Sequence, residues 1–198
     1  MAGGPEVAAW RVRLADYGWI LATMAGGAGV SFYLLPMPVA AFAAFLAVAA
    51  IFIAVVDIEY LVIPDSANTL LFAAGLVLVV VEAGRGAYFD AVADALLRSL
   101  VAGGAFALLR FGYMRRSGAE GLGLGDAKLV AAGAPFLAWS SLPVALLIAA
   151  AGGLLAVAAR AAIARQMPDR KAEIPFGAFL APAIWITFLI ERTGLLAY

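Results

Sequence analysis

Long apolar runs dominate the sequence, and only short stretches of glycine, proline and charged residues separate them. These runs predict seven helical segments, at roughly residues 17–35, 38–56, 67–82, 90–113, 127–141, 143–164 and 175–191. None of them shows the apolar–polar alternation of a membrane β-strand, so helices are the expected spanning structure. The third and fifth runs are short for a span of about 20 residues. We expect those two to tilt, to thin the bilayer, or to be partly re-entrant.

The composition supports a membrane location for these helices. Of the 198 residues, 66% are hydrophobic and only 13% are charged, whereas soluble domains have about a quarter charged residues. The expected fold is therefore all-α, a polytopic membrane bundle of about seven (six to eight) transmembrane helices. We expect one transmembrane domain over residues 17–198. Residues 1–16 contain Glu6 and Asp16 and do not read as a cleavable signal, so they are expected to form a cytoplasmic lead-in.

The distribution of Lys and Arg predicts the orientation. Ten of the 13 basic residues fall before the first run or around the connections between the fourth and fifth and between the sixth and seventh runs. Only Arg85 and Arg192 fall on the other side, and Arg98 lies within the fourth run. By the positive-inside rule, the N-terminus and the loops near 57–66, 114–126 and 165–174 are cytoplasmic.

The sequence has no cysteine and no histidine. This excludes disulfides, thiol catalysis, Cys/His metal sites and a Ser-His-Asp triad. The net charge of zero disfavours nucleic acid as a partner. We expect no metal and no cofactor, and chemistry that relies on carboxylates, hydroxyls, Lys and Arg.

Two acids lie where apolar runs meet the predicted cytoplasmic face. Asp57 ends the run AAIFIAVVD and Asp126 begins DAKLVAAGAPFLAW, so helices of opposite direction bring both to a similar depth. An acidic residue in or near a membrane is energetically costly, so it is treated first as a candidate functional residue. The alternative is that each acid is an interfacial cap, Asp126 as the N-cap of the fifth helix. Asp94, by contrast, has Arg98 one turn further on and is expected to form an ion pair with it.

Paired carboxylates have a specific chemistry. Two such groups in close proximity cannot both ionise easily, so they share one proton. One can then take a proton from an attacking water while the other hydrogen-bonds the peptide carbonyl and helps to protonate the leaving amine. The two carboxyl groups titrate together as a pair, so neither residue is assigned separately as the acid or the base.

Three stretches resemble the type IV prepilin peptidases, which are membrane aspartic proteases with a GxGD motif. The stretches are AVVDIEYLVIPDSANTLLFAAGL, GLGLGDAKL and IPFGAFLAPAIW, in the order of the family. The resemblance implies Asp57 and Asp126 as the catalytic aspartates. It implies supporting or substrate-binding roles for Gly123, Gly125, Lys128, Ile63, Pro64, Asp65, Pro175, Phe176 and Gly177. We expect Asp65 to cap the third helix, and Lys128 either to bias the shared proton or to meet lipid headgroups.

The resemblance also implies an activity and a location. The expected substrate is a type IV prepilin or pseudopilin-like precursor, whose short basic leader is removed at the cytoplasmic face of the bacterial inner membrane. The chain departs from the long form of the family because it lacks paired cysteines and its first run begins near residue 17. A short form with peptidase activity alone is therefore expected. It also has Ala178 where the family commonly has proline.

Two other classes of function stay open on the sequence alone. A small proton-coupled transporter would use Asp57, Asp94 and Asp126 as a relay, and would need repeats or broken helices that the sequence does not show. A structural assembly subunit would use the acids as helix caps only. A presenilin-like protease shares GxGD, but chain length and the Ile-Pro-Asp stretch disfavour it. The sequence does not indicate which precursor is cut, which pilus, secretion or competence system is served, or the oligomeric state.

Overall fold

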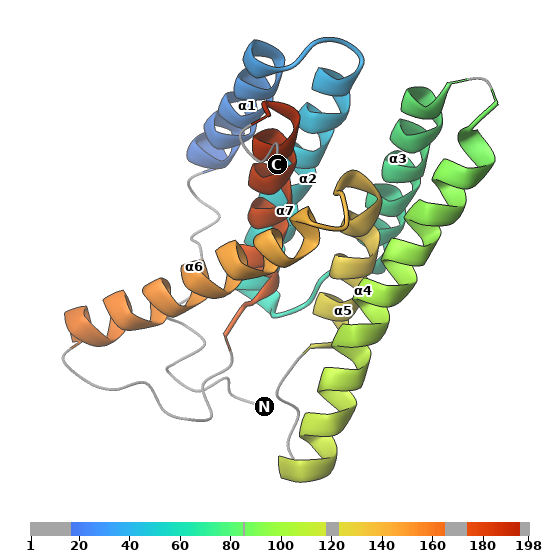
Figure 1. Ribbon diagram of the computed structural model, residues 1–198. Coiled ribbons are helices and arrows are strands. Elements are labelled where there is room, and N and C mark those ends of the chain that lie inside the picture. The colour runs from blue at the N-terminus through green and yellow to red at the C-terminus, as the bar shows by residue number, and fades with distance from the viewer. Residues whose placement is uncertain (1–16, 85, 118–122, 165–173, 195–198) are drawn as a thin grey trace.

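Seven α-helices follow the seven apolar runs (Figure 1). The computed structural model describes residues 17–84, 86–117, 123–164 and 174–194. The expected lead-in at 1–16 and parts of the loops expected at 114–126 and 165–174 lie outside these residues. The helices are α1 (Tyr17–Leu34), α2 (Val39–Tyr60), α3 (Asp65–Ala83), α4 (Tyr88–Ser117), α5 (Leu124–Gly133), α6 (Ser141–Ala164) and α7 (Gly177–Arg192), with a 3₁₀ turn, η3 (Ala134–Phe136), after α5.

Four of the helices, α2, α3, α4 and α6, are long and apolar enough to cross a membrane, and α1 is a shorter apolar helix. The described part of the chain contains no strand. The predicted all-α, multi-pass membrane bundle is therefore confirmed.

The fifth segment is shorter than the run from which it was expected. α5 has ten residues, which rise about 15 Å, half of the roughly 30 Å hydrocarbon core. It ends at Gly133, and Pro135 lies in the η3 turn that follows. The helix stops here because proline cannot donate the backbone hydrogen bond that a continuing α-helix needs. Residues 127–141 thus form a partial helix and a turn rather than a full span.

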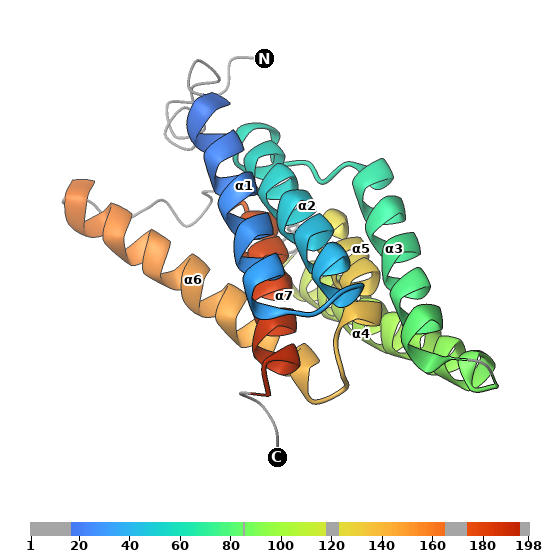
Figure 2. The ribbon, with the colours of Figure 1, turned by 90° about the horizontal axis from the view of Figure 1, so that it is seen from above.

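α2 is the centre of one group of helices and packs against α1 and α7 (Figures 1 and 2). Its buried face includes several alanines, among them Ala43, Ala47 and Ala50. A β-carbon at Gly27 of α1 would lie 3.1 Å from that of Ala47. Small residues at the contact let the helix backbones approach closely. α6 joins this group by packing against α7.

A second group contains α3, α4, α5 and η3. α5 also packs against α7 and thereby links the two groups (Figure 1). In the core between them, the rings of Phe136 and Phe188 meet edge to face with centroids 5.8 Å apart.

The end of α2 and the starts of α3, α5 and α7 lie together at one end of the bundle. Asp57, in the last turn of α2, bonds the start of α7, and Lys128 of α5 bonds Asp65 at the start of α3. We call this the aspartate end. The end of α3, the start of α4 and the end of α7 form the opposite, far end.

The tight contact at Gly75 yields a stability prediction. A β-carbon there would lie 2.8 Å from Cβ of Pro135 and 2.9 Å from the ring of Phe136, whereas one at Gly26 would meet nothing within 4 Å. Gly75→Ala should therefore lower the free energy of unfolding by about 1–3 kcal/mol through overpacking. Gly26→Ala should be neutral or stabilise by up to about 1 kcal/mol, because alanine favours the helix. Thermal unfolding in detergent compares the two, and equal midpoints would contradict the packing at η3.

Candidate active site

Asp57 is a buried carboxylate that binds the N-terminus of another helix. Its side chain comes from the last turn of α2 and is 5% exposed. The backbone N–H of Ala178 donates to its Oδ2 at 3.0 Å, and the N–H of Gly177 donates to the same carboxylate. These N–H groups belong to the first turn of α7, where they have no partner within the helix. The positive end of the α7 dipole thus faces the carboxylate.

The corner after Asp57 is sharp. Leu61 has φ of 55°, and its N–H bonds the carbonyl of Asp57 at 2.9 Å, which ends α2. Pro64 then stands in extended conformation as the N-cap of α3. The short link between these residues turns the side chain of Ile63 inward, where it is 7% exposed.

Ile63 contacts the glycines of the two other motifs. A β-carbon at Gly125 would lie 3.3 Å from Cβ of Ile63. One at Gly177 would lie 2.6 Å from Cδ1 of Ile63 and 3.0 Å from Oδ2 of Asp57. Real β-carbons do not approach other atoms so closely, so glycine at residue 177 keeps the space that Ile63 and Asp57 occupy. The three stretches that resemble the prepilin peptidases therefore converge on this one side chain.

Asp126 is the third residue of α5 and is 7% exposed. Gly123 is the N-cap, and its N–H donates back to the Asp126 carboxylate. This is the reciprocal half of a capping box, in which the third helical residue bonds the N-cap amide. The alternative in which Asp126 is the N-cap of the fifth helix is therefore wrong, although its carboxylate does accept the N-cap N–H.

The two aspartates interact electrostatically. The pKa of Asp126 is raised from 3.8 to about 6, chiefly by burial and further by the negative charge of Asp57, while the hydrogen bond from Gly123 opposes the rise. A charge acts on a neighbouring carboxyl in this way when the two lie close in a poorly hydrated site. The structure thus brings together two carboxylates from segments almost 70 positions apart in the sequence.

Asp65 and Lys128 form an ion pair that the sequence did not predict. Nζ of Lys128 lies 2.7 Å from Oδ1 of Asp65, and both side chains are exposed, at 45% and 73%. Pro64, not Asp65, is the N-cap of α3, so the prediction that Asp65 caps this helix is wrong. The pair joins the starts of α3 and α5 beside the buried aspartates.

The segment before α7 turns its backbone toward Asp57. Pro175 and Gly177 are buried, Phe176 is half-buried, and Phe176 is the N-cap of α7. Ala178 supplies an N–H to Asp57 that a proline at this position would lack. The departure from the common family residue therefore adds a hydrogen bond to the carboxylate.

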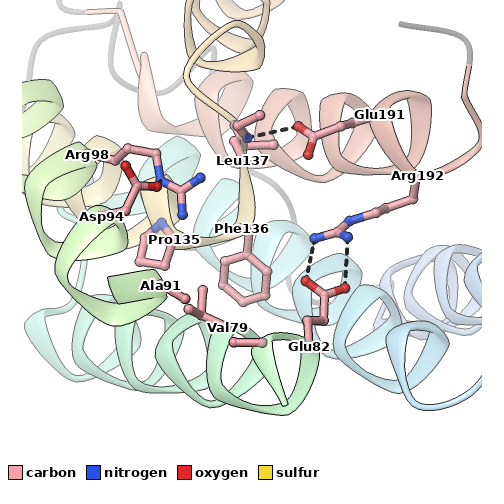
Figure 3. Close-up of a pocket in the computed structure, with 12 residues that line it drawn as sticks. Val79, Glu82, Ala91, Asp94, Arg98, Pro135, Phe136, Leu137, Glu191 and Arg192 are labelled. Atoms are coloured by element: carbon pink, nitrogen blue, oxygen red, sulfur yellow. Dashed lines mark hydrogen bonds and ion pairs between the residues drawn. The ribbon is translucent and has the colours of Figure 1, made fainter. Parts of the chain in front are cut away.

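A second polar cluster lies at the far end, around a pocket of about 290 Å³ (Figure 3). Arg192 binds Glu82 through two contacts of 2.7 and 2.8 Å. Glu191 accepts the N–H of Ala138 at 3.0 Å. The predicted pair of Asp94 and Arg98 is confirmed at 3.5 Å.

These partners indicate that the far-end acids hold α3, α4 and α7 together. Trp139 also donates its indole N–H to Asp94 at 2.8 Å. The sequence showed Glu82 and Arg192 only as charges at helix ends. Their pairing depends on how α3 and α7 pack, which no local pattern reveals. Among the described residues, no group of three or more acids could hold a metal ion.

The chain is also similar in sequence to known proteins. The model of the type IV leader peptidase family matches residues 44–158, a range that contains Asp57 and Asp126 and ends before Pro175. A prepilin leader peptidase/N-methyltransferase of Aeromonas salmonicida (strain A449) is 32% identical over 134 residues, which are 68% of this chain and 44% of that protein. The leader peptidase HopD of Escherichia coli is 36% identical over 108 residues, 54% of this chain and 67% of that protein.

The chain thus spans less than half of the Aeromonas protein. No solved structure matches the chain. The family match nevertheless covers more than half of the 198 residues. The chain belongs to the type IV leader peptidase family.

Proposed function

We propose that this protein is an aspartic endopeptidase that removes the leader peptide from type IV prepilin or pseudopilin-like precursors. The observation that carries the proposal is the pair of buried, interacting carboxylates at one end of the bundle, Asp57 and Asp126. The absence of cysteine and histidine from the sequence excludes thiol catalysis and a Ser-His-Asp triad, and an aspartic mechanism needs neither residue. The names of the relatives supply the substrate class, since both are leader peptidases.

In the proposed mechanism, the pair holds one proton and one negative charge. The ionised carboxylate takes a proton from a water molecule as the water oxygen bonds the peptide carbon. The protonated carboxyl hydrogen-bonds the carbonyl oxygen. As the carbon–nitrogen bond breaks, the protonated carboxyl passes its proton to the leaving amine. The carboxyl that took a proton from water stays protonated, so the two groups have exchanged protonation states. Hydrogen bonds from the α7 N–H groups and from Gly123 orient the two carboxylates.

The proposed site faces the cytoplasm at the bacterial inner membrane. The excess of Lys and Arg around the connections at this end supports that orientation. We propose residues 17–198 as the peptidase domain and cleavage alone, without N-methylation, as its activity. The substrate is the precursor, and membrane lipid surrounds the helices.

The transporter alternative has less support. Asp94 lies at the far end and is bound to Arg98 and Trp139. A relay from Asp94 to the aspartate end would have to pass the apolar core around Phe136 and Leu129.

Substitution of either aspartate tests the assignment. Asp57→Asn and Asp126→Asn should each lower cleavage of a co-expressed precursor by at least about 100-fold, because general acid–base catalysis is lost. Asparagine keeps an oxygen that accepts the backbone N–H, so the fold should persist. Leader removal is followed by gel shift at equal membrane levels, and the intact mass of the product shows whether the new terminus is methylated. Asp94→Asn is the matched control and should cleave normally. Full processing by either aspartate variant would refute the assignment.

Asp126 also gives a stability prediction that separates a catalytic pair from a simple cap. Its folded pKa, about 6, exceeds the unfolded value of 3.8. The folded chain thus binds more protons than the unfolded chain between these pH values, and wild-type stability falls as pH rises through this window. Asparagine does not titrate, so the Asp126→Asn variant does not lose stability in this way as the pH rises. Its thermal midpoint relative to wild type should therefore be higher at about pH 7 than at about pH 4. A variant less stable than wild type at neutral pH, with normal cleavage, would favour the cap alone.

Gly177 should be needed for activity more than for stability. In Gly177→Ala the new methyl would press on Ile63 and on Oδ2 of Asp57, and the carboxylate would shift. We expect cleavage to fall by about tenfold or more. Ile63→Val removes Cδ1, the atom that lies closest to the new methyl group. The double variant Gly177→Ala/Ile63→Val should therefore recover part of the lost cleavage rate, and the recovered part measures the coupling between the two positions. Gly29→Ala, where a β-carbon meets nothing within 4 Å, is the control. A Gly177→Ala protein that cleaves at the wild-type rate would contradict the close packing at Asp57.

A further inference from the structure

Ile63 lies where the two groups of helices meet at the aspartate end. It belongs to the link between α2 and α3, and this link joins the group that carries Asp57 to the group that carries Asp126. Its side chain is only 7% exposed. A hydrocarbon side chain exchanges no proton, so the proposed reaction leaves this buried residue without a role.

A chain of direct contacts runs through Ile63 from one aspartate to the other. On one side, a β-carbon at Gly125, the residue before Asp126, would lie 3.3 Å from Cβ of Ile63. On the other side, a β-carbon at Gly177 would lie 2.6 Å from Cδ1 of Ile63, and the N–H of Gly177 donates to the carboxylate of Asp57. A shift of Ile63 relative to either glycine therefore changes where one carboxylate lies relative to the other.

Both partners of Ile63 in this chain of contacts are glycines, so the isoleucine packs on main chain. A partner side chain could absorb a change in size by changing its rotamer, whereas the main chain at the start of a helix has to move as a whole. Close-packed interiors transmit such displacements to their neighbours. The size of residue 63 therefore acts directly on the backbone positions of α5 and α7.

Ile63 is itself restricted to few conformations. Pro64 follows it directly, and the residue before a proline is confined to extended backbone conformations. Branching at the β-carbon restricts rotation about χ1. Two residues earlier, Leu61 turns the chain with φ of 55°. A rigid residue in a short, sharply turned link is suited to keep two neighbouring segments at a set distance.

A second isoleucine packs on the same two helices but away from the carboxylates. Ile184 of α7 is 3% exposed, and its Cδ1 would lie 2.6 Å from a β-carbon at Gly133, the last residue of α5. It stands about 10 Å further along α7 than Gly177, the first residue of that helix. Ile184 thus has the burial and the glycine contact of Ile63 without the link to the aspartates.

We propose that Ile63 is a positioning residue that sets the distance between the carboxylates of Asp57 and Asp126. This inference rests on the proposed function, because the distance matters to catalysis only if the two carboxylates act as a pair. Ile63 acts through Gly125 on the start of α5, and through Gly177 on the carboxylate of Asp57. A smaller residue in its place leaves the two helix starts free to move relative to each other.

Truncation at residue 63 tests the proposal in the full chain. Ile63→Ala should lower kcat for a type IV prepilin by about tenfold or more, because the reacting groups are misplaced, while KM changes by less than about twofold. Ile63→Val keeps the β-branch, so its kcat should lie between those of Ile63→Ala and wild type. Ile184→Ala is the matched control, and it should lower the thermal midpoint as Ile63→Ala does but keep kcat per folded molecule. Equal kcat values in the two alanine variants would overturn the proposal.

The spacing itself is measurable without any substrate. The sequence contains no cysteine, so Tyr60→Cys combined with Leu124→Cys provides two unique sites for spin labels. These residues are 63% and 52% exposed and lie at the end of α2 and the start of α5, the helices that carry the two carboxylates. Ile63→Ala should broaden the distance distribution between the labels in pulsed electron paramagnetic resonance, whereas Ile184→Ala should not. An unchanged distribution in Ile63→Ala would refute the positioning role.

These measurements separate the positioning role from the peptidase assignment. Normal cleavage by Asp57→Asn or Asp126→Asn would refute the assignment, whatever the distances between the labels. Loss of cleavage in both aspartate variants, together with an unchanged distance distribution in Ile63→Ala, would refute the positioning role and leave the assignment standing.

Discussion

The hydrogen bond from the start of α7 to Asp57 joins residues 121 positions apart, and much of the aspartate end depends on it. It fixes the last turn of α2 against α7. It requires an N–H at Ala178, and the space that Asp57 and Ile63 fill requires glycine at residue 177. Ile63 occupies the space between Gly125 and Gly177 and thereby links α5 to the same contact. Asp57 and the neighbouring Ile63 thus connect three separate segments of the chain.

Helix capping and proton sharing follow from the same geometry. Each aspartate bonds N–H groups at a helix start, α7 for Asp57 and α5 for Asp126, which favours the charged form. For Asp126, burial and the negative charge of Asp57 oppose that charge and prevail. A site with this balance holds a carboxylate in a fixed orientation and still allows it to gain and lose a proton near neutral pH.

The sequence predicted the elements better than the contacts between them. The apolar runs define the helices because membrane insertion depends on local hydrophobicity, and opposite helix directions sufficed to bring Asp57 and Asp126 to one end. The ion pair of Asp65 and Lys128 depends on the relative rotation of α3 and α5.

α5 begins at the aspartate end and stops partway through the bundle. A full-length helix in its place would cover α3 and α4 along their entire height. Because α5 stops at Gly133 and the chain turns at Pro135, this helix fills only about half of the membrane depth. Asp126 therefore stands in the first turn of a short helix, held between α3, α4 and α7, where its carboxylate is buried within reach of the charge of Asp57. The break in the apolar pattern at Pro135 thus sets where α5 ends, whereas its glycine-rich start sets where Asp126 enters the bundle.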